Sequence, residues 1–307
     1  MPNASTDKPS SWTTLDLVKW TAGYFKDHQV ESARSEAEIL LAHALKTRRI
    51  DLYLNHDQPL CEDELKRFKA LIKRRVHGEP VAYITGTREF WSLAMAVNPS
   101  VLVPRPETEC LVEAVLPFLD DHAGSMKRVL EMGAGSGAII IALAHEHPEH
   151  HYVAMDRSAA AVQTARQNAR THKVDHRIDW FCGNWDAALL PDRETFDLIV
   201  SNPPYIRSRD INGLQPEIRN HEPQIALDGD GDGLRCIRHI IESAHRYLRT
   251  GGLIALEMAY DQKNDVHAIA GEVGKYSAPQ IIKDYSGHDR VALMVKKGLR
   301  PHTNFVI

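Results

Sequence analysis

Two patterns of apolar and polar residues divide the chain, and the first predicts helices. From Thr14 to about Val76, apolar residues recur every three or four positions, with Val18 and Phe25 on one such face. Ser35 is followed three residues later by Glu38, a capping-box pattern that predicts the start of a second helix. This part of the chain is therefore expected to form a small helical domain.

The second pattern begins near residue 78 and predicts strands. Residues 78–106 contain short β-branched stretches broken by glycine and proline, which favours a hairpin. Beyond a helix at 107–119, apolar strand candidates alternate with helical stretches, and this alternation predicts a doubly wound, mostly parallel α/β sheet. The strand candidates are 128–132, 152–155, 178–181, 196–200 and 253–258, followed by an antiparallel C-terminal hairpin at 281–284 and 290–295.

These patterns predict three parts. Residues 1–77 are expected to form the N-terminal helical domain, with about 1–12 disordered. Residues 78–106 would be a β-hairpin connector, and 107–307 the larger α/β domain. A length of 307 residues suits one large domain and one small one.

Composition and charge limit the class of protein, its partners and its expected location. Hydrophobic residues make up 43% and charged residues 25%, as in an ordinary globular protein. The net charge of -4 and a pI near 6.5 argue against a general polyanion binder, so no direct nucleic-acid binding is expected. Four isolated cysteines, the absence of a signal peptide and the lack of about 18 consecutive apolar residues predict a cytoplasmic protein without a membrane span. A monomer is expected.

A glycine-rich turn follows the first strand of the larger domain. It comprises Gly133, Ala134, Gly135, Ser136 and Gly137, after the acidic Glu131. Glycine permits a sharp turn from strand to helix and lets the backbone contact a ligand. Asp156 follows at the end of the next strand, 19 residues after Gly137, where a carboxylate can accept hydrogen bonds from ribose hydroxyls. The pair predicts a nucleoside-containing cofactor. The spacing suits either a dinucleotide or S-adenosyl-L-methionine.

A diproline turn ends the fourth strand and points to the chemistry. Asn202, Pro203, Pro204 and Tyr205 follow the apolar run 196–200, and the prolines stop the strand and restrict the backbone. An amide nitrogen is a poor nucleophile. The Asn202 side-chain oxygen and the Pro203 carbonyl can accept its two N–H groups and direct it at an activated methyl group, while Tyr205 can stack on the planar amide. This turn favours N-methyl transfer from S-adenosylmethionine.

The Asn202–Tyr205 turn resembles that of methyltransferases acting on adenine, cytosine or glutamine amino groups. The chain is more closely similar to the bacterial release-factor glutamine N5-methyltransferases, the PrmC/HemK family. The resemblance covers nearly the whole chain, including segments 80–86, 88–92, 103–109, 133–137, 156–157, 202–205, 222–223 and 231–233.

The resemblance assigns roles to individual residues. It implies that Gly133–Gly137 surround the methionine and ribose of the cofactor, that Asp156 binds the ribose hydroxyls and that Trp185 lies against the adenine. It also implies that Asn202–Tyr205 hold the glutamine of the Gly-Gly-Gln tripeptide in class I peptide-chain release factors. One departure is Asn184, where the family usually has aspartate.

Several alternatives stay open from sequence. The same chemistry could serve a large-subunit ribosomal protein, although segment 105–109 differs from the Arg-Ser-Pro typical of that paralogue. Adenine-N6 methylation of nucleic acid is disfavoured by the acidic pI and the lack of a recognition domain. A binding protein without catalysis is a third possibility. The clustered His145, His147, His150 and His151 are interpreted as a solvated loop, so no metal is expected.

Overall fold

The computed structural model describes residues 12–120, 125–190 and 193–298, and the chain divides into two units. One unit comprises the residues up to Gly86 together with Pro216–His221, and the other comprises Thr87–Gln215 and the residues from Glu222 onward. The expected disorder of residues 1–12 concerns positions that lie, except for Trp12, outside the described residues. The domain limits expected at 77 and 106 stay predictions.

The first unit is helical, as its periodicity predicted. Its elements are α1 (Thr14–Asp27), α2 (Ala33–Leu45), α3 (Asp51–Leu54), α4 (Glu62–Val76), α5 (Val81–Thr85) and α9 (Pro216–His221). Its core gathers apolar side chains from α1, α2 and α4, among them the fully buried Phe25, Leu41 and Phe68. These side chains recur at helical spacing, so each helix buries one face.

The capping box predicted at Ser35 is wrong. α2 begins earlier, at Ala33, and Glu38 is instead a buried carboxylate that accepts hydrogen bonds from Arg34, Arg49 and Tyr53. A buried carboxylate needs such donors, because moving a charged group out of water without hydrogen-bond partners costs free energy. The tertiary contacts of Glu38 therefore override the local capping pattern.

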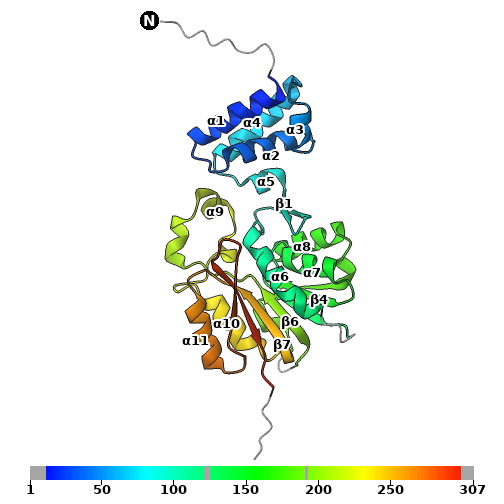
Figure 1. Cartoon of the computed structure of the whole chain (residues 1–307), viewed down its shortest axis with the longest axis vertical. Coiled ribbons are helices and arrows are strands. Elements are labelled where there is room, and N and C mark those ends of the chain that lie inside the picture. The colour runs from blue at the N-terminus through cyan, green and yellow to red at the C-terminus, as the bar shows by residue number, and fades with distance from the viewer. Residues whose placement is uncertain (1–11, 121–124, 191–192, 299–307) are drawn as a thin grey trace, which may run out of the picture. The chain divides into compact units, whose positions relative to one another are not determined.

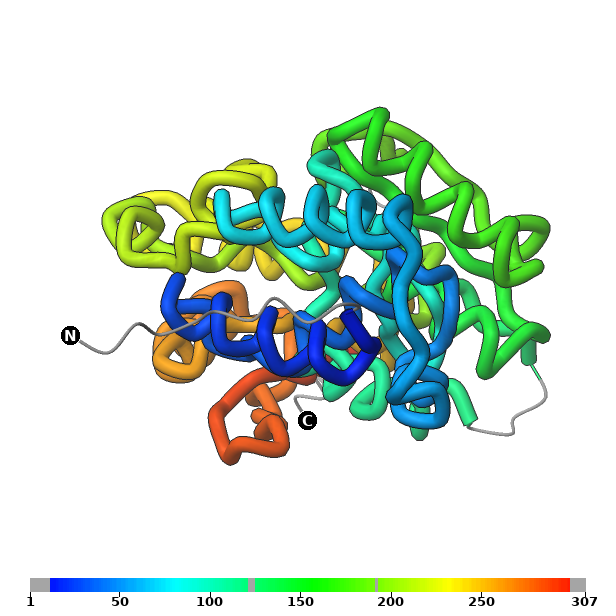
Figure 2. Tube along the Cα trace, turned by 90° about the horizontal axis from the view of Figure 1, so that it is seen from above, coloured from blue at the N-terminus to red at the C-terminus, as the bar shows by residue number. Residues whose placement is uncertain are grey.

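The basic helix α4 is bound to its neighbours through the buried Arg75. Arg75 is 7% exposed and forms ion pairs with Glu36 of α2 and with Glu217 of α9. Figure 2 shows α9, in yellow-green, beside the C-terminal end of α4, in cyan. Arg75 thus links segment 216–221 to α4 through an ion pair.

The second unit contains a seven-stranded mixed sheet, which confirms the predicted fold class. The strands are β3 (Arg128–Met132), β4 (His151–Asp156), β5 (Ile178–Cys182), β6 (Phe196–Ser201), β7 (Leu248–Glu257), β8 (Gln280–Lys283) and β9 (Asp289–Val295). Their order is β5-β4-β3-β6-β7-β9-β8, with β9 antiparallel to both of its neighbours. A short hairpin of β1 (Thr87–Phe90) and β2 (Leu93–Ala96) precedes the sheet.

Helices cover both faces of this sheet (Figure 1). They are α6 (Glu109–Leu119), α7 (Ala138–Glu146) and α8 (Ala159–Thr171) on one face, and α10 (Arg235–Ala244) and α11 (Lys263–Val273) on the other. Alternate strand residues enter the two cores: Val129 packs toward α7, and Leu130 packs toward α10. None of the helices in the described ranges is long and apolar enough to span a membrane.

From β3 the chain continues to β4 and β5 on one side of the sheet, and then to β6 and β7 on the other side of β3. This reversal creates a topological switch point next to β3. Ligands of doubly wound folds bind beyond the carboxyl ends of the strands at such a point. The glycine turn follows β3, Asp156 ends β4, and the diproline turn follows β6. The topology therefore brings the sequence-predicted features to one edge of the sheet.

Candidate active site

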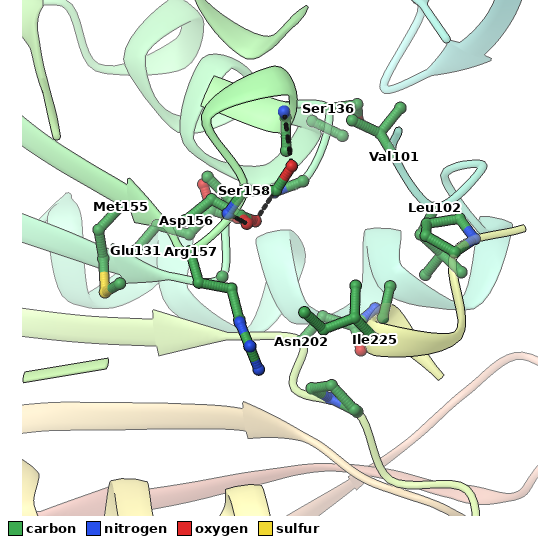
Figure 3. A pocket seen from close by; sticks show the side chains of 18 of the residues that line it. Val101, Leu102, Glu131, Ser136, Met155, Asp156, Arg157, Ser158, Asn202 and Ile225 are labelled. Atoms are coloured by element: carbon green, nitrogen blue, oxygen red, sulfur yellow. Dashed lines mark hydrogen bonds between the residues drawn. The ribbon is translucent and has the colours of Figure 1, made fainter. Parts of the chain in front are cut away.

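A cavity lies at this edge and is lined by most of the predicted site residues (Figure 3). From the predicted set its lining includes Gly133, Ala134, Gly135, Ser136, Asp156, Trp185, Asn202 and Pro204. Gly137, Pro203 and Tyr205 are not among the lining residues. The cavity therefore joins the glycine turn to the diproline turn, and the roles of single residues stay predictions.

The glycine turn has a backbone shape that other residues adopt only with strain. Gly133, Gly135 and Gly137 have φ values of +79°, +55° and +79°. A Cβ atom on Gly137 would lie 2.9 Å from Ile141 and 3.0 Å from Ala165, so this glycine allows α7 to pack on α8. A Cβ on Gly135 would meet nothing within 4 Å. This turn is an open cradle of backbone on the cavity side.

Asp156 connects the cradle to the end of β4. Its Oδ2 accepts a hydrogen bond from the Gly135 N–H at 2.9 Å, and its Oδ1 accepts one from the Ser158 N–H at 2.8 Å. Figure 3 shows the carboxylate facing the cavity beside Ser158. A carboxylate has about four lone-pair sites, so Asp156 keeps acceptor capacity for a pair of ligand hydroxyls.

Trp185 and Asn184 form another part of the lining, after β5. Trp185 begins a short 3-10 helix (Trp185–Ala188) with a φ of +50°, which is uncommon for a bulky residue. Its ring lies 3.8 Å from the position of a Cβ on Gly133, so the indole is in van der Waals range of the glycine turn. Next to it, Asp186 is fixed by hydrogen bonds from His239 and Tyr247 at 2.8 and 2.9 Å.

These features fit S-adenosylmethionine. The glycine backbone leaves open space, Asp156 offers acceptors for two hydroxyls, and the Trp185 indole offers an aromatic surface in the same cavity. When bound, this cofactor supplies a methyl group on a positively charged sulfur that leaves readily.

Glu131 lies beneath the glycine turn and lines the cavity. It is 1% exposed, and its Oε2 accepts a hydrogen bond from the Ile140 N–H in the first turn of α7, at 3.1 Å. Burial raises the pKa of Glu131 well above its usual range, and the nearby charge of Asp156 adds to this effect. Glu131 is thus a buried acid next to the cradle.

The diproline turn presents Asn202 to the cavity. The Asn202 Nδ2–H donates to the Thr108 hydroxyl oxygen at 3.1 Å, and this leaves the side-chain oxygen Oδ1 as the acceptor of the group. Asn202 and Pro204 line the cavity together with Thr108. The arrangement offers an oriented amide acceptor at the end of the cavity formed by β6.

Tyr205 is held by the core behind the diproline turn. Its hydroxyl donates to Glu257 Oε1 at 2.9 Å, and its ring packs against the core that contains α10 and α11. Its carbonyl accepts a hydrogen bond from the buried Gln262, which also binds the Gly233 carbonyl, each at 3.1 Å. These contacts hold the diproline turn from behind, and a stacking role for Tyr205 stays a prediction.

Glu222 holds another part of the cavity wall in place through hydrogen bonds. The buried Glu222 accepts hydrogen bonds from the Arg105 guanidinium at 2.6 Å and from the Val103 N–H at 3.3 Å. Arg105 lines the cavity, as do Pro223 and the half-exposed Ile225. Segments 103–105 and 222–226 are thereby tied together at the cavity edge.

Thr108, Glu257 and Gln262 were missed as site residues by sequence reasoning. A signal for Glu257 existed, because an acid that ends an apolar strand of a doubly wound sheet lies at the ligand edge. Thr108 lies inside a motif segment that was noted only for its resemblance. Gln262 carries no sequence signal of this kind.

The histidine cluster remains outside this site. Ligand atoms of His147, Glu149 and His150 lie within 4.8 Å of one another. However, His150 Nδ1 faces the Lys127 N–H at 3.4 Å, and its Nε2 faces the Leu119 carbonyl at 3.2 Å. Both ring nitrogens of His150 are engaged with the backbone, and the expectation of no metal stays a prediction.

Two known family models match the chain, one in its N-terminal helical part and one in the α/β part. Residues 16–86 match the model of the PrmC N-terminal domain, and residues 108–217 match the model of the methyltransferase small domain. The chain is 42% identical over 286 residues to the release factor glutamine methyltransferase of Geobacter sulfurreducens, covering 93% of this chain and 98% of that protein. It is 39% identical to the protein of the same name from Caulobacter vibrioides, again covering 93% and 98%.

Solved structures support the fold. A methyltransferase from Pyrococcus furiosus superimposes with a TM-score of 0.50 at 20% identity, covering 74% of this chain and 98% of that one. At this identity the likeness concerns the architecture of the chain rather than its substrate.

Proposed function

The chain belongs to the release factor glutamine methyltransferase family, and we propose that it methylates the side-chain nitrogen N5 of the glutamine in the Gly-Gly-Gln tripeptide of class I release factors. It is an S-adenosylmethionine-dependent methyltransferase. The observation that carries the proposal is the Asn202 amide, oriented by Thr108 in the same cavity as the glycine cradle and Asp156.

Different residues would bind the cofactor and position the substrate amide. Gly133–Gly137, Asp156 and Trp185 would hold the cofactor. Asn202 Oδ1 and the Pro203 carbonyl would accept the two N–H groups of the substrate amide, aim its nitrogen and stabilise the positive charge that develops on it. When bound, S-adenosylmethionine would supply the methyl group to this nitrogen; the electron pair of its C–S bond would stay on sulfur and the nitrogen proton would depart to water. Because the sulfonium is a good leaving group, Asn202 needs only to position the nitrogen.

The substrate follows from the relatives rather than from the chemistry alone. Their names favour release factors over the two alternatives left open by the sequence, a ribosomal protein or adenine. A cytoplasmic location belongs to the same proposal. Monomeric state and the absence of direct nucleic-acid binding stay predictions.

Transfer of labelled methyl groups to a purified class I release factor tests this function. Mass spectrometry should find one added CH₂ unit on the tripeptide glutamine. A release factor with that glutamine replaced by alanine should take up no label. Label on ribosomal protein or on DNA, with none on the release factor, would overturn the substrate assignment.

A further inference from the structure

Three polar side chains form a stripe along α8 that the chemistry described above does not use. Thr164, Asn168 and His172 follow one another at intervals of four residues, so they lie on one face of the helix, with His172 as its C-cap. Each of them binds the segment that begins in β2. The contacts are His172 Nε2–H with the Ala94 carbonyl at 2.9 Å, Asn168 with the Ala96 backbone, and the Thr164 hydroxyl oxygen with the Asn98 Nδ2–H at 3.0 Å.

This stripe takes the place of a neighbouring strand for β2. Among the described residues, β2 pairs with one strand, β1. Alternate residues of a strand direct their N–H and C=O groups to the same side, and Ala94 and Ala96 are two positions apart. Their outward backbone groups therefore face α8, whose side chains bind a strand edge that would otherwise stay open.

Asn168 also contacts the cofactor cradle. It is 1% exposed, and its Oδ1 accepts a hydrogen bond from the Ala96 N–H at 2.7 Å. Its Nδ2 donates to the Ala96 carbonyl at 3.0 Å and to the Ser136 carbonyl at 2.9 Å, so both of its N–H groups are used. Ser136 lines the cavity, near Val101 of the segment that follows β2 (Figure 3), whereas Ala96 does not line it. One buried amide thus connects the cradle to the hairpin edge.

The contact with Ser136 acts on the shape of the cradle. The Ser136 carbonyl belongs to the peptide group that joins Ser136 to Gly137, and Gly137 has a φ of +79°. Because the orientation of this peptide group sets that φ angle, Asn168 restrains the backbone that faces the cofactor. No other side-chain type of this length offers two donors and one acceptor. Leucine has a similar size but would leave three backbone groups without partners, which costs free energy in a buried place.

We propose that Asn168 is a positioning residue for the cofactor, which holds the Ser136–Gly137 peptide in its binding conformation and links that conformation to the docking of the β1–β2 hairpin on α8. Without Asn168 the cradle populates other conformations, and the affinity for the cofactor falls with the fraction that stays competent. By linkage, cofactor binding stabilises the hairpin on α8. The inference requires only that the cavity binds S-adenosylmethionine, whichever group receives the methyl.

Calorimetry on the full-length protein tests the first half of this proposal. Asn168→Leu should raise the Kd for S-adenosylmethionine by about tenfold, because the Ser136 carbonyl loses its buried donor. The KM for the cofactor should rise in parallel, whereas kcat at saturating cofactor should stay within about threefold, because Asn202 keeps its contact with Thr108. An unchanged Kd in a folded Asn168→Leu protein would reduce Asn168 to a structural role and overturn the proposal.

His172→Ala is the matched control within the same stripe. It removes a contact with the hairpin, at Ala94, and leaves the bonds between Asn168 and Ser136 in place. Thermal unfolding should occur at a lower temperature, while the Kd for S-adenosylmethionine should change by less than about twofold. An equal rise of the Kd in His172→Ala and Asn168→Leu would show that general loosening of the hairpin, rather than the bond to Ser136, weakens binding.

Hydrogen exchange of the wild type tests the linkage without any substitution. Saturating S-adenosylhomocysteine should slow exchange of the Ala96 N–H by about tenfold or more, although Ala96 does not line the cavity. The slowing should exceed that of Met95, which pairs with Arg88 inside the hairpin. An Ala96 rate that the ligand leaves unchanged would overturn the proposal, even where Asn168→Leu does not fold. A wild type that shows this protection but methylates no release factor would refute the proposed substrate and leave the role of Asn168 standing.

Discussion

The two ends of the cavity are built by different means. At the cofactor end, five consecutive residues form the cradle, and their backbone conformation determines its form. Asp156 accepts a hydrogen bond from a backbone N–H of this cradle. At the amide end, side chains from distant parts of the chain meet: Asn202 donates to Thr108, and Tyr205 of the same turn donates to Glu257. Cofactor binding should therefore depend on the glycines and on Asp156, whereas single side-chain losses at the amide end should lower turnover.

Asn202→Ala is expected to have the largest effect on turnover, and it tests the difference between the two ends of the cavity. Losing one aligning acceptor should lower kcat by about 10²- to 10³-fold, by analogy with the loss of one oxyanion-hole donor. The Kd for S-adenosylmethionine, measured by calorimetry, should change little because the cradle is intact. Asn220→Ala, at an exposed asparagine of α9, serves as the control. Near wild-type turnover in Asn202→Ala would show that the amide end does not depend on this side chain.

A change at the other end should give the reverse pattern. Asp156→Ala removes hydrogen bonds from a charged group, worth about 1.5–3 kcal/mol, and should weaken cofactor binding by roughly 10- to 100-fold. Because Asn202 is untouched, kcat at saturating cofactor should fall much less than in Asn202→Ala. Calorimetric titration and steady-state kinetics separate the two effects. An unchanged Kd would remove Asp156 from the cofactor site.

Substitution of the last glycine of the cradle tests how far its backbone shape matters. Gly137→Ala places a Cβ within 3.0 Å of Ile141 and Ala165 at a φ of +79°, so the free energy of unfolding should fall by about 1–3 kcal/mol. Gly271→Ala in α11 is the matched control, since its Cβ would meet nothing within 4 Å. That change should raise stability by about 0.5–1 kcal/mol. Equal effects of the two changes in denaturant titrations would contradict this account of the cradle.

The smallest effect concerns the buried acid below the cradle. The pKa of Glu131 is raised in the folded protein by burial and by Asp156, so its protonated form favours folding. Its contribution is complete below the unfolded pKa of about 4.3 and is lost as pH rises toward the folded pKa. Relative to Glu131→Gln, the free energy of unfolding of the wild type should therefore decrease by about 1 kcal/mol per pH unit within that window. A pH-independent difference would contradict it.

Local features of the chain were sufficient to predict much of this protein. The strand candidates 128–132 and 196–200 match β3 and β6 closely, because apolar runs bounded by glycine or proline specify strands directly. The glycine turn, Asp156 and the diproline turn could be placed at one edge, because parallel strands end on the same side of a sheet. Resemblance of motifs along the chain supplied the family.

Other features depended on contacts between distant residues. Asn202 and Thr108 are 94 positions apart, and Tyr205 and Glu257 are 52 positions apart, so no local pattern reveals that they meet. The same holds for Glu38, which looked like a capping residue and instead accepts three hydrogen bonds in a buried position.

The sequence by itself determined the sheet, the cradle and the position of the diproline turn, because periodicity and turn chemistry act over neighbouring residues. Only the tertiary structure decided which way Asn202 faces, where the Tyr205 hydroxyl goes and which acid lies behind them. These are matters of hydrogen-bond direction inside a packed core, where the available partner, rather than the residue's own preference, fixes each polar group.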